Sequence, residues 1–413
     1  MLETKTKIKN SLRDLAIMGG SPLFNRELYV GCPEIGDRNN FFERVNDIFD
    51  QRKLTNNGKY VREFEERVTK FTGVKHCIAV CNGTVGLELV IRALELKGEV
   101  ILPSLTFIAT AHALLWSGVK PVFCDVNPET FCIEPREVER MVSPETSGII
   151  GVHLFGRVCE VNKLQNIANK HGLKLLLDAA HAFGSTKTGK SVGSFGNAEV
   201  FSFHATKVVN CFEGGAILTN DDCFADKLRV MRNFGFKGLD TVIALGVNAK
   251  MSEVSAAMGL TSLESFEDVV SINKGNYVLY KKLLAGIPGI SLFDYDLEEK
   301  NNFQYIVLSI DDKTLGISRD ILMKVLRAEN ILARRYFYPG CHRMEPYCSM
   351  FTDFDSSLPI TDRINNQLIQ LPTGSTIGPQ DIEKICGLIS FCARNSQAIK
   401  IIPDSAELAK IIK

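Results

Sequence analysis

Short apolar segments alternate with helical patterns between about residues 60 and 220, and this alternation limits the possible folds more than any other feature. Strands are predicted at His76–Cys81, Glu99–Leu102, Lys120–Asp125, Gly148–His153, Leu173–Asp178 and Glu199–Phe203. Helical patterns lie between them, at Thr84–Leu96 and near 107–117, 135–142 and 162–171. Such an alternation predicts an α/β fold with a mostly parallel sheet covered by helices. In these sheets, ligands bind beyond the carboxyl ends of the strands.

The pattern changes after about residue 250. Residues 251–285 form one long helical pattern that could join two domains, and the segments Phe303–Ile310 and Ile331–Tyr338 predict strands of a smaller α+β domain. We therefore predict an N-terminal arm over residues 1–30, a large domain over 31–275 and a small C-terminal domain over 276–413.

Composition and charge exclude several classes of protein. The chain has 413 residues, is 45% hydrophobic and 23% charged, and has a formal net charge of zero. These values predict a folded globular protein and argue against a nucleic-acid binder, which would usually carry a basic face. No run of 18 apolar residues is present and the first residues do not resemble a secretion signal, so we expect no membrane span. Twelve cysteines without a CxxC pair or zinc-site spacing predict reduced thiols in a cytoplasmic protein without a metal site.

Two charged residues follow apolar strands. Asp178 ends the segment LLLDAAHAFG, where a carboxylate needs a cation or hydrogen-bond donors; it could cap a helix or pair with a cationic ring nitrogen of a cofactor. Lys207, in SFHATKVVNCFEGGAIL, could be an exposed loop lysine. If it is instead desolvated by its apolar surroundings, its amine would lose proton affinity and could act as a nucleophile.

Two further segments join a strand to a helix. In CNGTVGLEL, the backbone at Gly83 and Thr84, with the Thr84 hydroxyl and the helix N-terminus, could bind an anion, although Gly-Thr is also a common turn. It is not a Walker loop, because no GKT or GKS follows. Phe107, in PSLTFIATAHAL, could belong to the core or could stack on a flat cofactor ring.

Together these segments resemble one known family. The motifs LTNNGKYVREFEE, CNGTVGLEL, ILPSLTFIATAHAL, PVFCDV, GVHLFG, LLLDAAHAFG, SFHATK, EGGAILTND, MRNFGF and GVNAKMSEVSAAMGL occur in the order found in the DegT/DnrJ/EryC1/StrS sugar aminotransferases. The resemblance runs from about residue 30 to residue 380, and SFHATK before EGGAI is its most specific part. It implies the aspartate aminotransferase fold, which is fold type I of the pyridoxal-phosphate enzymes.

The resemblance also implies roles for individual residues. Lys207 would hold pyridoxal 5'-phosphate covalently, Asp178 would keep its ring nitrogen protonated, and His181 would lie near the ring hydroxyl. The other residues that the motifs place at the cofactor are Phe107 on the ring face, Gly83, Thr84 and Ser202 at the phosphate, and Asn248, which would reach the phosphate from a neighbouring subunit. A homodimer with shared active sites is therefore implied. Lys250 stands where the family often has Arg, which puts a bidentate anion contact there in doubt.

The resemblance further implies L-glutamate as the amino donor and a nucleotide-linked keto sugar as the acceptor. The form of SFHATKVVNCFEGGAI is more similar to enzymes that aminate C4 of a dTDP-4-keto-6-deoxyhexose than to those that act at C3. For the substrate we consider Asn57 with its neighbours Asn56 and Gly58, as well as Lys250, Arg334, Arg335, Tyr338 and His342. Asn56–Gly58 could equally form only a turn, and the stretch LARRYFYPGCH could be an edge strand with a solvated basic face.

Three other functions remain open at this point. One is amination at C3, or of a UDP- or GDP-linked sugar. Another is dehydration of the sugar by the same cofactor, against which the presence of Lys207 argues, since dehydratases of the family have His there. The third is a regulatory protein that has kept the fold without activity; this would predict a broken cofactor set, whereas Thr84, Asp178, Ser202 and Lys207 are all present.

Overall fold

The computed structural model describes residues 9–351 and 358–399. Its main element is a seven-stranded sheet with the order β2-β10-β9-β6-β5-β3-β4. The strands are β2 (His76–Val80), β3 (Glu99–Pro103), β4 (Lys120–Cys124), β5 (Thr146–Val152), β6 (Lys174–Asp178), β9 (Ala198–Ser202) and β10 (Gly215–Thr219). Neighbouring strands are parallel except at β10, which is antiparallel to both β2 and β9. The predicted α/β fold with a mostly parallel sheet is confirmed.

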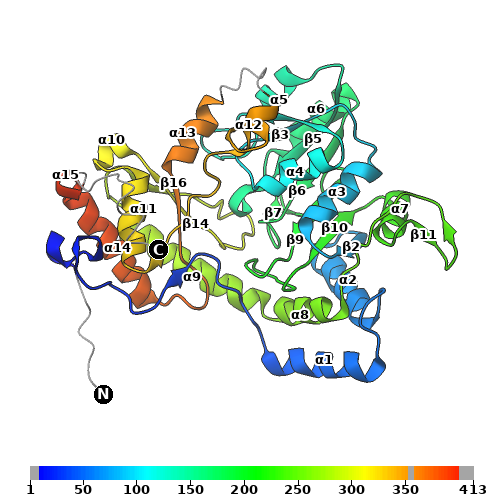
Figure 1. The fold of residues 1–413 in the computed structure, drawn as a ribbon, viewed down its shortest axis with the longest axis horizontal. Coiled ribbons are helices and arrows are strands. Elements are labelled where there is room, and N and C mark those ends of the chain that lie inside the picture. Colours follow the sequence, from blue (N-terminus) through cyan, green and yellow to red (C-terminus); the bar gives the residue numbers. More distant parts are fainter. Residues whose placement is uncertain (1–8, 352–357, 400–413) are drawn as a thin grey trace.

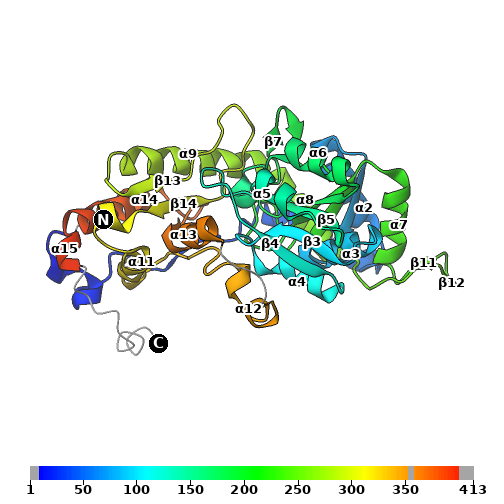
Figure 2. The ribbon, with the colours of Figure 1, turned by 90° about the horizontal axis from the view of Figure 1, so that it is seen from above.

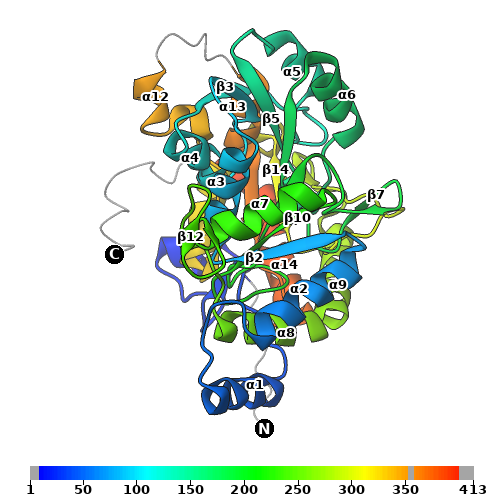
Figure 3. The same cartoon turned by 90° about the vertical axis from the view of Figure 1, so that its right-hand side faces the viewer.

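Helices cover both faces of this sheet (Figure 3). One apolar layer contains the buried sides of α3 (Gly83–Ala93), α4 (Ile108–Trp116) and α7 (Asp222–Arg232). The opposite layer contains those of α2 (Lys59–Thr72), α5 (Pro135–Met141), α6 (Val161–His171) and α8 (Glu253–Glu264). The amphipathic spacing explains this arrangement: in α2, for example, Val61, Phe64 and Val68 recur every three or four residues and are all buried.

A smaller group of elements follows in sequence (Figure 1). Its antiparallel sheet consists of β13 (Ile290–Leu292), β14 (Ile306–Ile310) and β16 (Leu368–Leu371). Its helices are α10 (Asp312–Leu315), α11 (Arg319–Ala328), α12 (Tyr347–Met350), α13 (Pro359–Gln367), α14 (Pro379–Arg394) and α15 (Ser396–Ile399). The expected smaller α+β part is therefore present.

The helical pattern at 251–285 is interrupted in the structure. It forms two helices, α8 and α9 (Phe266–Leu284), which meet at Ser265, so the prediction of one long helix is wrong at this residue. The Ser265 hydroxyl donates to the Ser262 carbonyl oxygen at 3.2 Å, a local side-chain bond of the kind that competes with regular helix. Helix α9 extends from the large sheet toward the smaller part (Figure 2). The domain boundary that we place near residue 276 falls inside α9 and stays a prediction.

The predicted strand Ile331–Tyr338 is wrong beyond its second residue. Only β15 (Ile331–Leu332) is strand, and it pairs in parallel with β1 (Leu28–Tyr29) from the N-terminal segment. After β15 the chain turns, and Arg334 makes an isolated bridge to Gln370. The apolar residues of this segment were consistent with a strand. Phe337 is buried, but it packs against the rings of Phe107, Phe155 and His181 and does not join a sheet.

The remaining short elements lie at the edges. They are α1 (Arg38–Gln51), which packs on α8, the hairpin of β7 (Thr186–Lys187) and β8 (Lys190–Ser191), and the hairpin of β11 (Phe236–Lys237) and β12 (Thr241–Val242), which projects from the molecule (Figures 1 and 2). The N-terminal segment is anchored by Lys9, whose amino group lies 2.9 Å from the fully buried carboxylate of Glu329. Among the described residues, no helix combines the length and the apolar character needed to cross a bilayer.

Candidate active site

A cavity of about 620 Å³ lies at the carboxyl ends of β2, β5, β6 and β9. The antiparallel strand β10 begins there, and residues from the smaller part form the opposite wall. Seven of the predicted cofactor residues line this cavity: Gly83, Thr84, Phe107, Asp178, His181, Ser202 and Lys207. They come from four separate segments, so the fold brings together side chains that are far apart in the sequence.

Asp178 is the last residue of β6 and is 7% exposed. Its Oδ2 accepts a hydrogen bond from the Thr110 hydroxyl at 2.8 Å, and its Oδ1 accepts one from the Ala180 N–H at 3.1 Å. The Ala180 contact resembles that of a helix N-cap, which was the alternative role considered for Asp178. Among the described residues, however, no helix begins here. The carboxylate is thus held in one orientation at the cavity wall, ready to meet a cationic group.

Lys207 follows β9 in a turn, where its N–H donates to the carbonyl oxygen of His204 at 2.9 Å. Its amino group lies 3.4 Å from the hydroxyl of Tyr305. Burial lowers the pKa of Lys207 from its usual 10.5 to about 8, while the charge of Asp178 opposes this change. About a tenth of a lysine with such a pKa is neutral at pH 7, far more than of an ordinary lysine, and the neutral amine is the nucleophilic form.

His181 lies between aromatic rings on one side of the cavity. Its ring is stacked with those of Phe155 and Phe337, at centroid distances of 6.2 Å and 5.8 Å, and is tilted against Tyr305 at 4.6 Å. Its Nδ1 accepts a hydrogen bond from the Phe155 N–H at 3.3 Å. Burial, and then the positive charge of Lys207, hold the pKa of His181 well below its usual value, so the ring is neutral and its Nε2 carries the proton.

The N-terminus of α3 forms the base of the cavity. The Asn82 side chain caps this helix by accepting a hydrogen bond from the Val85 N–H at 2.9 Å, and Gly83 and Thr84 form its first turn. The unsatisfied N–H groups of such a turn attract anions. Ser202 lies beside them, since a Cβ added to Gly83 would be 3.2 Å from the Ser202 Cβ. Gly215 completes the close packing, because a Cβ there would be 2.7 Å from the Gly83 nitrogen.

Three other predicted residues lie outside the cavity. Asn57 is exposed and its carbonyl oxygen accepts from Arg62 at 2.7 Å; with Asn56 it lies in a turn in which both have positive φ. Asn248 is exposed next to the projecting hairpin. Lys250 donates to Asn233 Oδ1 at 2.9 Å and lies 4.5 Å from the centre of the Phe234 ring. Within one chain, none of these three side chains reaches the ligand that we predict for it.

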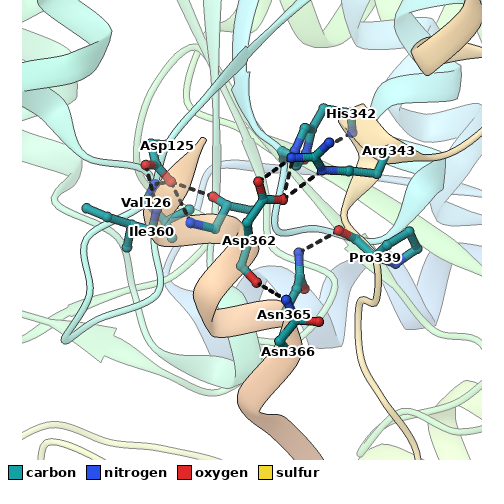
Figure 4. A network of polar contacts seen from close by, with 11 residues as sticks. Asp125, Val126, Pro339, His342, Arg343, Ile360, Asp362, Asn365 and Asn366 are labelled. Atoms are coloured by element: carbon teal, nitrogen blue, oxygen red, sulfur yellow. Dashed lines mark hydrogen bonds and ion pairs between the residues drawn. The ribbon is translucent and has the colours of Figure 1, made fainter. Parts of the chain in front are cut away.

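His342 and Tyr338 are also outside the cavity. His342 is 7% exposed, and its ring nitrogens contact the Ser104 hydroxyl at 2.6 Å and an Asp362 oxygen at 3.1 Å. Figure 4 shows it beside Arg343, with both side chains facing Asp362. Both ring nitrogens therefore have partners within the chain, and the substrate contact of His342 stays a prediction. Tyr338 lies with Arg335 in a separate small pocket, and only Arg334 of this stretch lines both pockets.

Several residues in or beside the cavity were not singled out from the sequence, although some of them lie inside the motifs quoted above. Thr110, which orients Asp178, looks like any helix residue, and Tyr305 looks like part of an apolar strand. The others are Thr106, His204, Thr206, Glu213, Gln304, Tyr336, Phe337 and Gln370. For Gln304, Tyr305 and Gln370, which lie outside the quoted motifs, the position at the cavity depends on chain segments that come together only in the folded protein.

The residues present fit pyridoxal phosphate. A buried amine of lowered pKa, a buried acid on the same cavity and an anion-binding helix N-terminus are the three features that its aldehyde, ring nitrogen and phosphate require. Lys207 would hold the aldehyde carbon, Asp178 the ring nitrogen, and Gly83, Thr84 and Ser202 the phosphate. Phe107 begins α4 at the cavity and is 55% exposed, which leaves its face available for the ring.

Comparison with known proteins gives a consistent result. Residues 36–390 match the model of the DegT/DnrJ/EryC1/StrS aminotransferase family. The chain is 36% identical over 370 residues to a dTDP-4-amino-4,6-dideoxy-D-glucose transaminase of Escherichia coli, covering 88% of this chain and 98% of that one. It is 32% identical to a GDP-perosamine synthase of Caulobacter vibrioides, covering 83% and 92%.

Solved structures agree with these sequence matches. The crystal structure of DesI in the presence of its TDP-sugar product is 47% identical, with a TM-score of 0.90, and covers 94% of this chain and 98% of DesI. The Helicobacter pylori aminotransferase PseC, of pseudoaminic acid biosynthesis, is 26% identical with a TM-score of 0.83, over 90% and 100% of the two chains. The chain therefore belongs to the DegT/DnrJ/EryC1/StrS family and is a pyridoxal-phosphate-dependent aminotransferase.

Proposed function

We propose that the protein transfers an amino group from L-glutamate to C4 of dTDP-4-keto-6-deoxyglucose. The observation that carries this proposal is the buried Lys207 amine on one cavity with Asp178 and the anion-binding turn at Gly83 and Thr84. The choice of sugar is supported by the Escherichia coli relative, whose name specifies the 4-amino-4,6-dideoxyglucose product, and by DesI, which binds a TDP-sugar product. A GDP-linked sugar is the second candidate, because of the relative named GDP-perosamine synthase.

The chain's own residues provide acid–base chemistry and orientation. Pyridoxal phosphate, when bound, supplies an aldehyde that captures amines and a ring that accepts the electrons of a carbanion. Lys207 would hold the aldehyde carbon of the cofactor, and its free amine would accept and return the proton of the substrate carbon; its lowered pKa keeps part of the amine neutral for this task. Asp178, whose carboxylate is held by Thr110 and Ala180, would keep a proton on the ring nitrogen. Neutral His181 can donate its Nε2 proton to the ring hydroxyl.

We further propose a homodimer in which each active site uses residues of both subunits. The support is an exposed apolar surface on and beside the projecting hairpin: Leu239, Val242, Ile243, Leu245 and Val247 are 91%, 58%, 56%, 75% and 45% exposed. A patch of this kind marks an interaction surface in a folded protein. It lies next to Asn248 and Lys250, two of the predicted site residues that one chain leaves away from the cavity. In a dimer they would reach the cofactor phosphate and the substrate anion of the neighbouring subunit.

The dimer can be tested by the mass of the protein in solution. Leu239→Asp places a charge at the most exposed of these apolar side chains and is expected to produce monomers with little activity. Leu297→Asp is the matched control, since Leu297 is 62% exposed but lies outside the hairpin. A Leu239→Asp protein that stays dimeric and fully active would contradict this assignment of the interface.

A cytoplasmic location is the last part of the proposal. All twelve cysteines lie in the described residues and are free thiols, as in proteins kept in a reducing compartment.

The substrate is tested by separating the two half-reactions. Glutamate should bleach the absorbance of the holoenzyme above 400 nm, and the resulting amine form should then be reoxidised by its keto sugar. We expect dTDP-4-keto-6-deoxyglucose to restore the absorbance faster than its GDP-linked counterpart or a 3-keto isomer. Failure of all the nucleotide-linked keto sugars would refute the proposed acceptor, while faster restoration by the GDP-linked sugar would favour the second candidate.

A further inference from the structure

Two glutamines line the cavity, and the structure uses them differently. Gln304 is bound to the loop that carries Lys207: its Oε1 accepts from the Val208 N–H at 3.2 Å and its Nε2 donates to the Thr206 carbonyl oxygen. Both ends of its amide are therefore occupied on either side of Lys207. Gln304 is a positioning residue for that loop and has little capacity left for a ligand.

Gln370 has the opposite character. It lies in β16, is 2% exposed, and its amide oxygen is buried without a hydrogen-bond partner among the described residues. Leaving a buried acceptor unpaired costs free energy, and buried polar groups in folded proteins almost always have a partner. Because almost none of this oxygen's surface is open to the cavity, the amide has to turn toward the cavity before a ligand there can bring the missing donor.

The strand pairing explains why this side chain meets the cavity. Gln370 is opposite Val307 of β14, and Tyr305 precedes Val307 by two residues, so all three share one side of the sheet. Tyr305 lies on the cavity beside Lys207. The backbone of Gln370 is fully used, because its N–H donates to the Arg334 carbonyl oxygen at 2.8 Å and its own carbonyl oxygen accepts from the Arg334 N–H at 3.1 Å. Only the side chain is left for a ligand.

Arg334 restricts the kind of ligand. Its guanidinium lies over the Tyr336 ring at 4.5 Å, and the residue also lines the cavity, so a cation and an unpaired acceptor lie on two bridged segments of one wall. Glutamate could use the cation, but once its amine has reacted it has only carboxylates, which cannot donate a hydrogen bond to an amide oxygen. A sugar hydroxyl can donate, and the phosphates linked to that sugar can face the cation.

We propose that Gln370 is a specificity residue that accepts a hydrogen bond from a ring hydroxyl of the sugar substrate. This inference rests on the proposed function, because it requires that the acceptor be a sugar with free hydroxyls. The Gln370 amide therefore contributes to the half-reaction with the keto sugar and not to the half-reaction with glutamate.

The test compares both half-reactions in the holoenzyme, by stopped-flow absorbance, for Gln370→Leu and Gln304→Leu. In Gln370→Leu, the second-order rate constant for the keto sugar should fall about 10- to 100-fold while that for glutamate changes less than about 2-fold. In Gln304→Leu, both rate constants should fall, since the loop of Lys207 serves both substrates. The thermal midpoint of the cofactor-free Gln370→Leu protein should not fall, because an unpaired polar group has been removed.

Deoxy analogues of the keto sugar identify the hydroxyl. With the wild-type enzyme, the analogue that lacks the bonded hydroxyl should lose a factor similar to that lost in Gln370→Leu, and it should lose nothing further in the variant. The inference is overturned if Gln370→Leu leaves the sugar rate constant unchanged, slows both half-reactions equally, or responds to every analogue as the wild type does. A wild-type enzyme that aminates no nucleotide-linked sugar would instead refute the proposed function.

Discussion

The Thr110 hydroxyl donates a hydrogen bond of 2.8 Å to Oδ2 of Asp178, and so joins helix α4 to the end of strand β6. Thr110→Val keeps the shape of the side chain but removes this bond. Hydrogen bonds to charged groups contribute about 1.5–3 kcal/mol, so we expect kcat/KM to fall roughly 10- to 100-fold while the protein stays folded. Steady-state kinetics and thermal unfolding of the variant measure the two effects.

Thr106→Val is the matched control for Thr110→Val. The Thr106 hydroxyl lies 2.9 Å from that of Thr110 and does not contact Asp178 directly. A smaller loss of kcat/KM is therefore expected. If the two variants were equally impaired, the effect would belong to the threonine pair as a whole and the direct contact would have no special importance.

Replacing Lys207 by Ala should abolish turnover, because it removes the amine that we propose to hold the cofactor and to move the proton. The absorbance of the cofactor is expected to shift to that of the free aldehyde, even if the phosphate cradle still retains it. Lys190→Ala, an exposed lysine in β8, should leave activity and spectrum unchanged. Retention of full activity in Lys207→Ala would exclude the assigned role.

The lowered pKa of Lys207 predicts a pH dependence of cofactor loading. The neutral amine attacks the aldehyde, and its fraction rises as pH rises through about 8. The rate at which the cofactor-free protein takes up pyridoxal phosphate, followed by absorbance, should therefore increase between pH 7 and pH 9 and then level off. A midpoint near the ordinary lysine value of 10.5 would mean that burial does not control this amine.

Gly215→Ala should damage the phosphate site. Its Cβ would lie 2.7 Å from the backbone of Asn82 and Gly83, which cannot yield without moving the first turn of α3. Overpacking of this kind costs about 1–3 kcal/mol, and we expect weaker binding of pyridoxal phosphate together with a lower thermal midpoint.

Gly275→Ala serves as the comparison for Gly215→Ala. Gly275 is exposed within α9, and nothing lies within 4 Å of the position of its added Cβ. Alanine is favoured over glycine inside helices by about 1 kcal/mol, so this variant should be as stable as the parent protein or slightly more so. Equal destabilisation by both substitutions would rule out the steric explanation at Gly215.

The residues that sequence reasoning identified share a local signature. Asp178 and Lys207 each follow an apolar strand of a parallel sheet, and the fold brings such positions to one edge regardless of other details. Gln370 and Tyr305 could not be found in this way, since their positions depend on the pairing of β14 with β16. The contacts of His342 could not be predicted either, because its partners, Ser104 and Asp362, lie far from it in the sequence.

The same limit explains the errors in the secondary structure. The segment after Leu332 has strand-like periodicity, but the bridge between Arg334 and Gln370 and the packing of Phe337 on His181 draw it to the cavity. Tertiary contacts override such a local pattern whenever a buried side chain finds partners from another part of the chain.

Val30 and Gly31 line the cavity directly after β1, which is held by pairing Leu28 with Ile331 and by the Lys9–Glu329 ion pair. The ribosome makes these residues early, but the strand and the carboxylate that hold them emerge only after most of the chain has been synthesised. Until those residues have been synthesised, Val30 and Gly31 cannot take their places in the cavity wall. We therefore expect the complete cofactor site to form only after nearly the whole chain has been made.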